Sequence, residues 1–179
     1  MQPNRSLVAL ILVAAVAGLV LGRSLAARSA GSGQARVVYV VDGDTVHVER
    51  GGRELIVRLI GVDAPEVPHP GKPGACYGAE ATTFVRRAVL GRPVRLVAGV
   101  EPTDRYGRSL AEVVVLAGPL AGRDLSEELA AHGLARPLAI PPNTSDAPRI
   151  ATLVRQAQRA SLGLWSACGF TAAFPNARR

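Results

Sequence analysis

Short β-rich runs separated by turn residues, with helical patterns between and after them, predict a mainly β protein that also contains α-helices. Five runs have strand character and three segments have helical character. This set is typical of a small, partly open five-stranded β-barrel of the OB-fold type with three helices, preceded here by an N-terminal hydrophobic segment. The 179 residues allow one domain with a stable core.

The composition excludes several classes of protein. With 48% apolar residues the chain is not disordered throughout, and two cysteines are too few for a disulfide-rich mini-protein or a four-cysteine zinc site. The formal net charge of +7 suggests a polyanionic partner, but residues 1–41 carry +4 of it and leave +3 for the rest of the chain. Recognition of a polyanion would therefore depend on a few placed charges.

Residues 7–22 form an uncharged apolar run of 16 residues after a short start that contains Arg5. A helix needs about 20 apolar residues to cross a bilayer, so this run fits the hydrophobic region of a signal peptide or a short uncleaved anchor. Ser24 and Ala26 supply a small-residue cleavage pattern, and the sequence is compatible with both outcomes. We expect residues 1–35 to be this leader plus a linker, and the domain to be secreted or tethered to a membrane outside the cytoplasm.

The first half of the domain predicts a meander of three strands. The strand patterns lie at residues 37–41, 45–49 and 54–60, and a pair of glycines forms the second turn. Four prolines then exclude regular structure from residue 64 to residue 74.

The second half combines two strands with three helices. The strand patterns lie at residues 93–98 and 110–116, and the helical patterns at residues 76–90, 124–133 and 146–162. Asp124 followed by Glu127 is a capping-box pattern for the second helix. We expect the domain to span residues 36–168 and residues 169–179 to be a C-terminal tail.

Carboxylates lie at the ends of these strands. Asp42 and Asp44 occupy a strand-to-strand bend, and Asp63 and Glu66 follow the third strand. Hard oxygen ligands such as Asp44 and Asp63 suit Ca²⁺ or Mg²⁺ better than zinc. Glu66 beside such a cation could orient or deprotonate a water molecule.

Two arginines complete the pattern. Arg58 interrupts an apolar strand five residues before Asp63, and Arg108 follows a turn at the start of another strand. Guanidinium groups aimed at one place would suit a phosphodiester. Each motif alone is explained equally well by a turn, a solvated strand end or a surface ion pair, but their order along one chain predicts metal-assisted phosphodiester hydrolysis.

The order and spacing of the motifs resemble the staphylococcal nuclease, or thermonuclease, family of Ca²⁺-dependent OB-fold nucleases. The resemblance covers residues 37–166 and rests on the stretches VVDGDTVHV (40–48), VRLIGVDAPE (57–66), CYGAEATTF (76–84), TDRYGRSLAEV (103–113), GRDLSEELAAHGLA (122–135) and LGLW (162–165). The family's reaction cleaves the 5′ P–O bond of DNA or RNA and leaves 3′-phosphate ends. The resemblance therefore implies a nucleic acid substrate.

The resemblance also implies a metal site. Asp44 and Asp63 would be carboxylate ligands of Ca²⁺, the backbone carbonyl of Ala64 would be a third protein ligand, and Asp42 would support the ion through water. No protein partner is evident, and a monomer is expected.

For the reaction, the resemblance implies that Glu66 is the general base or positions the attacking water. Arg58 and Arg108 would bind the scissile phosphate and stabilise the transition state. Tyr106 and the neighbouring Arg105 would contact substrate phosphates. On this assignment Glu66→Gln and Arg58→Ala are expected to reduce cleavage far more than folding stability.

Two departures from the family pattern concern the substrate. Ala64 stands where the best-known member has a threonine, which keeps the carbonyl and loses a hydroxyl. Residues 136–142 include no aromatic side chain to stack on a base, an interaction of about 1–3 kcal/mol. The alternative function is a catalytically inactive OB-fold module that binds nucleic acid or protein, although such a module would typically lose Glu66, Arg58 or an aspartate.

Cys76 and Cys168 carry one further hypothesis. Export permits a disulfide between them, which would close a loop of about 90 residues next to the candidate site. Two buried free thiols are the alternative.

Overall fold

The computed structural model describes residues 33–168, 173 and 174. Residues 1–32 of the predicted leader and linker lie outside the described residues, as does most of the predicted tail. Gln34 and Ala35 were assigned to the linker but belong to the first strand, Gln34–Val40, so the boundary at residue 36 is too late. Among the described residues, no helix is both long enough and apolar enough to cross a membrane.

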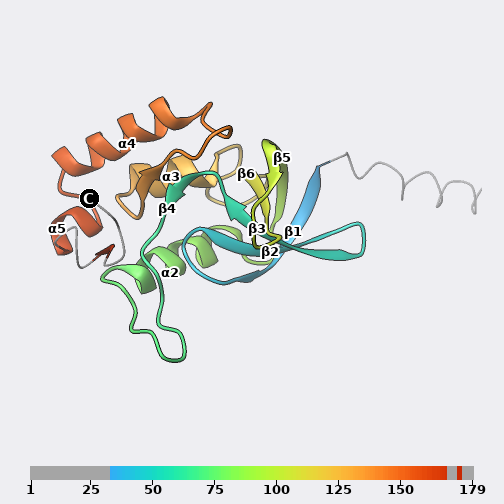
Figure 1. The fold of residues 1–179 in the computed structure, drawn as a ribbon, viewed down its shortest axis with the longest axis horizontal. Coiled ribbons are helices and arrows are strands. Elements are labelled where there is room, and N and C mark those ends of the chain that lie inside the picture. Colours follow the sequence, from blue (N-terminus) through green and yellow to red (C-terminus); the bar gives the residue numbers. More distant parts are fainter. Residues whose placement is uncertain (1–32, 169–172, 175–179) are drawn as a thin grey trace, which may run out of the picture. The chain divides into compact units, whose positions relative to one another are not determined.

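Five strands close into a barrel in the order β1-β2-β3-β6-β5 (Figure 1). They are β1 (Gln34–Val40), β2 (Thr45–Arg50), β3 (Arg53–Leu59), β5 (Pro93–Thr103) and β6 (Ser109–Val115). Neighbouring strands are antiparallel except β3 and β6, which are parallel. The five predicted strands are confirmed, but the expectation of a partly open barrel is wrong, because residues 34–36 of β1 pair with residues 93–95 of β5.

β5 continues to Thr103, beyond its predicted end at residue 98. The added residues lie in a polar stretch that includes Pro102, which cannot donate a backbone hydrogen bond to a neighbouring strand. The structure accommodates the proline because the pairing of β5 with β6 is irregular between Ala98 and Thr103.

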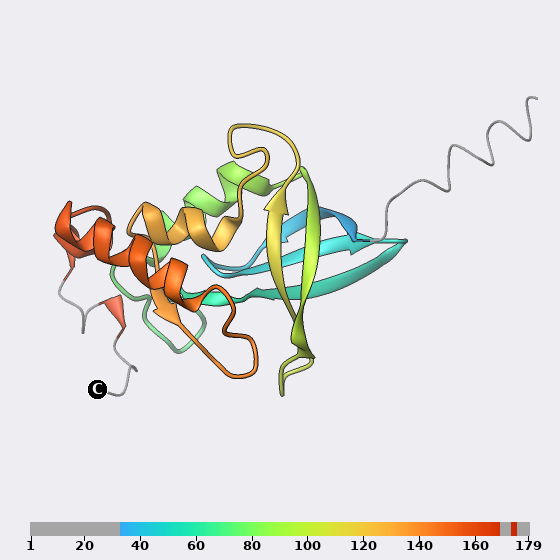
Figure 2. The same cartoon turned by 90° about the horizontal axis from the view of Figure 1, so that it is seen from above.

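The helices gather at one end of the barrel (Figure 2). They are α2 (Gly78–Val89), α3 (Leu125–Ala131), α4 (Ala147–Arg159) and the short α5 (Leu164–Ala167), of which α5 was not predicted. Asp124 caps α3 by accepting the N–H of Glu127 at 3.0 Å. This is the N-cap half of the predicted capping box. The Glu127 carboxylate instead binds Arg149 of α4, with Oε2 2.7 Å from Nη2, and so links two helices.

A second, two-stranded sheet consists of β4 (Gly61–Asp63) and β7 (Arg136–Leu138). Its strands are antiparallel and place Asp63 directly opposite Arg136. The sequence did not predict this sheet, because each strand has three residues and one contains Pro137. It joins the end of the barrel meander to the segment that follows α3.

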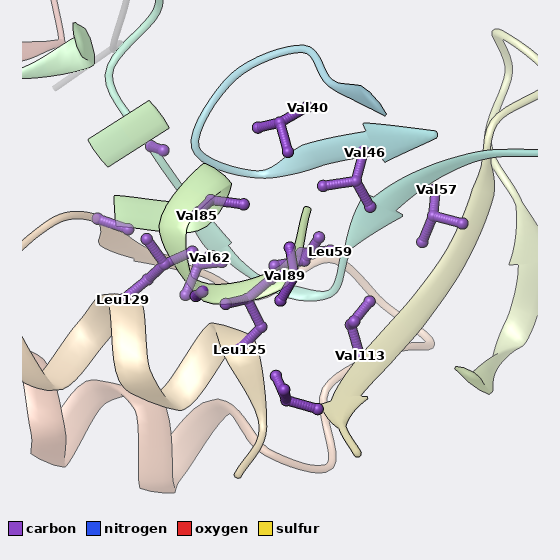
Figure 3. Packing of buried hydrophobic residues seen from close by; sticks show 14 of the residues in the cluster. Val40, Val46, Val57, Leu59, Val62, Val85, Val89, Val113, Leu125 and Leu129 are labelled. Carbon is purple, nitrogen blue, oxygen red and sulfur yellow. The ribbon is translucent and has the colours of Figure 1, made fainter. Parts of the chain in front are cut away.

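One apolar core fills the barrel and continues between the barrel and the helices (Figure 3). Alternate residues of the strands point into it, as expected for strands buried on one face. Its fully buried members include Val46, Val57, Leu59, Val62, Val85, Val113, Leu125 and Leu129. The core gives the strand ends that carry the candidate site residues a rigid frame.

The predicted disulfide is present in the structure. Cys76 and Cys168 are joined, with their Cα atoms 6.1 Å apart. The bond links the residues just before α2 to the end of α5, across 92 positions of sequence.

The double substitution Cys76→Ser and Cys168→Ser is expected to lower the free energy of unfolding by up to about 4.6 kcal/mol, because the unfolded chain regains the entropy of a long closed loop. Denaturant unfolding followed by circular dichroism measures the change. Thiol titration of the denatured, unreduced wild type is the companion experiment. It should find no free thiol, and two titratable thiols would contradict the bond.

Carboxylates from three elements lie together where β6 meets the starts of α3 and α4. Burial, a hydrogen bond with Asp146 and the charges of Asp146 and Asp124 raise the pKa of Glu112 to about 7, against the opposing effect of Arg95. Burial also raises the pKa of Asp124 to about 6. The folded state therefore retains protons here that the unfolded chain releases near its ordinary pKa, and stability falls as pH rises through this interval.

Glu112→Gln is expected to stabilise the fold at pH 8 and to have little effect at pH 4.5, since glutamine keeps a donor for Asp146 without a charge. Thermal unfolding at both pH values measures the effect. Glu49→Gln, an exposed glutamate on β2, is the matched control. A stabilisation by Glu112→Gln that is the same at both pH values would contradict the raised pKa.

Candidate active site

The bend between β1 and β2 folds tightly against the start of α2. Asp42 Oδ1 accepts the N–H of Asp44 at 2.9 Å, a side-chain turn typical of aspartate. A Cβ at Gly43 would lie 2.6 Å from the Cβ of Ala64 and 3.0 Å from that of Ala81, so glycine is required between the two aspartates. This packing holds the bend, and with it Asp44, against Ala64, which follows β4.

Asp44 and Arg58 form a buried ion pair. Arg58 Nε lies 3.0 Å from Asp44 Oδ1, and the two side chains are only 11% and 8% exposed. Asp44 Oδ2 accepts the N–H of Ala64 at 2.7 Å, and Thr45 Oγ1 lies 3.1 Å from Asp44 Oδ1. These contacts hold the carboxylate of Asp44 in one orientation.

Asp63 joins the same group and is held from two sides. Its Oδ1 lies 3.4 Å from Arg58 Nη2, and its Oδ2 accepts from Arg136 Nε at 2.8 Å and lies 2.7 Å from Arg136 Nη2. Arg58 Nη1 donates to the carbonyls of Leu59 and Val62 at 2.7 and 2.9 Å. The sequence did not identify Arg136, because its position opposite Asp63 depends on the unpredicted sheet of β4 and β7.

Carboxylates outnumber guanidinium groups around Asp44 and Asp63. Burial raises the pKa of Asp44 to about 7, against the opposing charge of Arg58, and Asp42 and Asp63 act in the same direction as burial. Burial, with Asp42 and Asp63, also raises the pKa of Glu66. Four carboxylates thus share one electrostatic environment with the guanidinium groups of Arg58 and Arg136.

The donor set fits a hard divalent cation of the calcium type. Asp44 and Asp63 supply carboxylate oxygens, and Ala64 is fixed beside Asp44 by its N–H. Among the described residues, no group of three or more His, Cys, Asp or Glu side chains is arranged to hold a metal ion. A cation here would therefore need two carboxylates, a backbone carbonyl and water, which is a set that Ca²⁺ accepts.

Glu66 lies at the rim of the group. Its side chain is 65% exposed, and its Oε2 is 3.9 Å from Nε2 of His69. Its backbone is fixed: the Glu66 carbonyl accepts the N–H of Ala75 at 2.9 Å, and a Cβ at Gly78 would lie 2.3 Å from this carbonyl oxygen. The loop between β4 and α2 projects from the body in Figure 1. Its two ends are joined by this hydrogen bond, and Glu66 lies at the joined ends.

Arg58 and Arg108 line the same cleft, which has a volume of about 540 Å³. Arg108 Nε lies 2.7 Å from Asp104 Oδ2, within the turn that joins β5 to β6. Burial opposes ionisation of Asp104, but hydrogen bonds from Arg108 and Tyr106 outweigh it and lower the pKa of this carboxyl. A charged Asp104 therefore fixes the direction of Arg108.

Tyr106 stands at the mouth of the cleft between two arginines. The guanidinium carbons of Arg105 and Arg108 are 4.7 and 5.5 Å from its ring centroid, and Arg105 Nη2 donates to its hydroxyl at 2.6 Å. The ring is 68% exposed. The structure thus brings the four residues predicted to contact phosphate, Arg58, Arg105, Tyr106 and Arg108, to one cleft.

The opposite wall of the cleft is aliphatic. It includes Leu138, Ile140 and Pro141, and Asn143 anchors this segment to the backbone of Glu101 at 3.0 and 2.9 Å. Ile140 is 59% exposed. The wall offers apolar contact to a base without an aromatic face.

A closed OB-type barrel with a carboxylate group beside an arginine-lined cleft defines a class of protein suited to phosphate esters. A family model described as "Staphylococcal nuclease homologue" matches residues 56–167. The chain is 39% identical over 132 residues to a thermonuclease of Staphylococcus hyicus, covering 73% of this chain and 75% of that protein. It is 38% identical over 129 residues to a thermonuclease of Staphylococcus intermedius, covering 72% and 74%.

A shorter match covers 46% of the chain and 26% of a probable endonuclease of Coccidioides posadasii, with 41% identity over 83 residues. Taken with the fold and the site, these matches show that the chain belongs to the staphylococcal nuclease homologue family.

The buried pair changes the expectation for Arg58. Arg58→Met leaves Asp44 buried without its guanidinium, so we expect a loss of about 3 kcal/mol in the free energy of unfolding at pH 8 with a chelator present. Arg108→Met is the control, because the 31% exposed Arg108 pairs with Asp104 at the surface and should cost below about 1 kcal/mol. Denaturant unfolding compares the two, and equal losses would contradict the structural role of Arg58.

Proposed function

We propose that the protein is a Ca²⁺-dependent nuclease that hydrolyses the 5′ P–O bond of DNA or RNA and leaves 3′-phosphate ends. Membership of the staphylococcal nuclease homologue family and the two thermonuclease relatives support a nuclease in general. The observation that carries the proposal is the cleft that Arg58 and Arg108 share, because Arg58 also contacts both candidate metal ligands.

Asp44, Asp63 and the carbonyl of Ala64 would hold the cation, and Asp42 would support it through water. When bound, the cation would supply Lewis-acid polarisation of a phosphoryl oxygen. Arg58 lines the cleft and contacts both of these carboxylates, so its guanidinium would bind a phosphate that lies beside the cation.

Glu66 would position and deprotonate the attacking water. Its exposed carboxylate is accessible to solvent, and its backbone is held at the base of the loop. Arg108, directed by Asp104, would bind the scissile phosphate and stabilise charge on the leaving oxygen. Tyr106 and Arg105 would contact a neighbouring phosphate at the mouth of the cleft.

We also propose that the protein acts outside the cytoplasm, secreted or tethered through residues 7–22. The disulfide between Cys76 and Cys168 supports this location, because such bonds persist in oxidising compartments.

Purified protein is expected to degrade denatured DNA with Ca²⁺ and to stop when a chelator is added. Glu66→Gln should lower the cleavage rate at least about a hundredfold, the usual contribution of a general base, without lowering the thermal midpoint. Glu80→Gln, an exposed glutamate on α2, is the matched control and should retain full activity.

The alternative is an OB-fold module that binds nucleic acid without cutting it. Binding of labelled DNA with no cleavage under Ca²⁺ would favour that module. Equal loss of cleavage and stability in Glu66→Gln would also count against the catalytic assignment.

A further inference from the structure

Two described residues near the C-terminus, Ala173 and Phe174, pack next to the candidate active site. Ala173 and Phe174 are 1% and 6% exposed, and they form a small apolar cluster with Leu164, Tyr77 and Trp165. The family match ends at residue 167, and the sequence predicted only a tail beyond residue 168. These two residues are therefore part of the folded body.

Phe174 contacts the arginine that holds Asp63. The guanidinium carbon of Arg136 lies 4.6 Å from the centroid of the Phe174 ring, a cation–π distance. The same guanidinium donates a hydrogen bond from Nε to Asp63 Oδ2 and forms an ion pair with it through Nη2. The register of β4 and β7 places Arg136 directly across from Asp63. Three residues from distant parts of the sequence thus form one line of contacts.

The two carboxylate oxygens of Asp63 have different partners. Nε and Nη2 of Arg136 both face Oδ2. Oδ1 is on the side of Arg58, 3.4 Å from its Nη2, and Arg58 in turn contacts Asp44. A carboxylate held through one oxygen presents the other in a fixed direction. Hydrogen-bond partners of metal ligands act in this way, and their loss typically costs about 10- to 100-fold in metal affinity.

We propose that Arg136 is a positioning residue for Asp63 and that Phe174 fixes Arg136, so that Phe174 contributes to Ca²⁺ binding from outside the candidate ligand set. This inference rests on the proposed function, in which Asp63 is a ligand of the cation. Arg136 contributes orientation, which outweighs the repulsion between its positive charge and the cation.

Calorimetric titration of the purified protein with Ca²⁺ tests the role of Arg136 without any substrate. Arg136→Met should weaken Ca²⁺ binding about 10- to 100-fold. Arg136→Gln, which keeps N–H donors for Asp63 without the charge, should recover part of this loss. If Arg136→Met binds Ca²⁺ as tightly as the wild type, or more tightly, Arg136 does not position Asp63 and the proposal is overturned.

Phe174→Leu tests the second contact, because leucine keeps the apolar volume and removes the aromatic face. We expect Ca²⁺ affinity to fall about two- to fivefold, the scale of one cation–π contact. Phe84→Leu on α2 is the matched control, because the Phe84 ring packs against His132 at the end of α3. This substitution should leave Ca²⁺ affinity unchanged. Thermal unfolding in chelator confirms that each variant is folded.

The double variant separates a shared role from two independent ones. If Phe174 acts through Arg136, Phe174→Leu should cause no further loss of Ca²⁺ affinity in the Arg136→Met background, and additive losses would overturn the relay. A wild type that binds no Ca²⁺ would overturn the proposed function and this inference together. A wild type that binds and cleaves while Arg136→Met binds equally well would overturn this inference alone.

Discussion

The buried guanidinium of Arg58 is the constraint on which the site depends. It contacts Asp44 before β2, Asp63 at the end of β4 and the carbonyls of Leu59 and Val62. One side chain from β3 therefore connects the bend before β2 with β3 and β4. Charges this far from water are costly unless they are paired, and the pairing fixes their positions. The carboxylates are thus assembled before any ligand arrives, and the closed barrel keeps their backbone from relaxing.

The placement of charge explains how a chain of modest basicity can be suited to a polyanion. Beyond residue 41 the excess of positive charge is only +3, too small for broad electrostatic attraction. The structure concentrates guanidinium groups at one cleft and sets a carboxylate group next to it. The aliphatic wall that includes Ile140 adds apolar area, so the phosphate backbone would dominate recognition over the identity of the base.

The sequence predicted the parts of the site that depend on short spacing. Asp42, Asp44, Arg58 and Asp63 lie at or near the ends of strands that follow one another along the chain, where local patterns are strong, and the disulfide hypothesis followed from two cysteines in a chain expected to be exported. Arg136 could not be predicted, because it reaches Asp63 across 73 positions through three-residue strands, one of which contains a proline. Barrel closure was missed for a related reason: residues 34–36 have no β-rich pattern, and their strand depends on pairing with β5 and, at Arg36, also with β2.

The hydrogen bond from Ala75 to the carbonyl of Glu66 has a mechanical consequence. It joins the two ends of the loop at Glu66 and Ala75, and the neighbouring disulfide at Cys76 fixes the second end to the rest of the fold. Residues 67–74 can then move, or differ in number and sequence, with little displacement of the Glu66 backbone. The middle of the loop can therefore differ in length and sequence among related chains, while its joined ends keep the Glu66 carboxylate beside the candidate cation site.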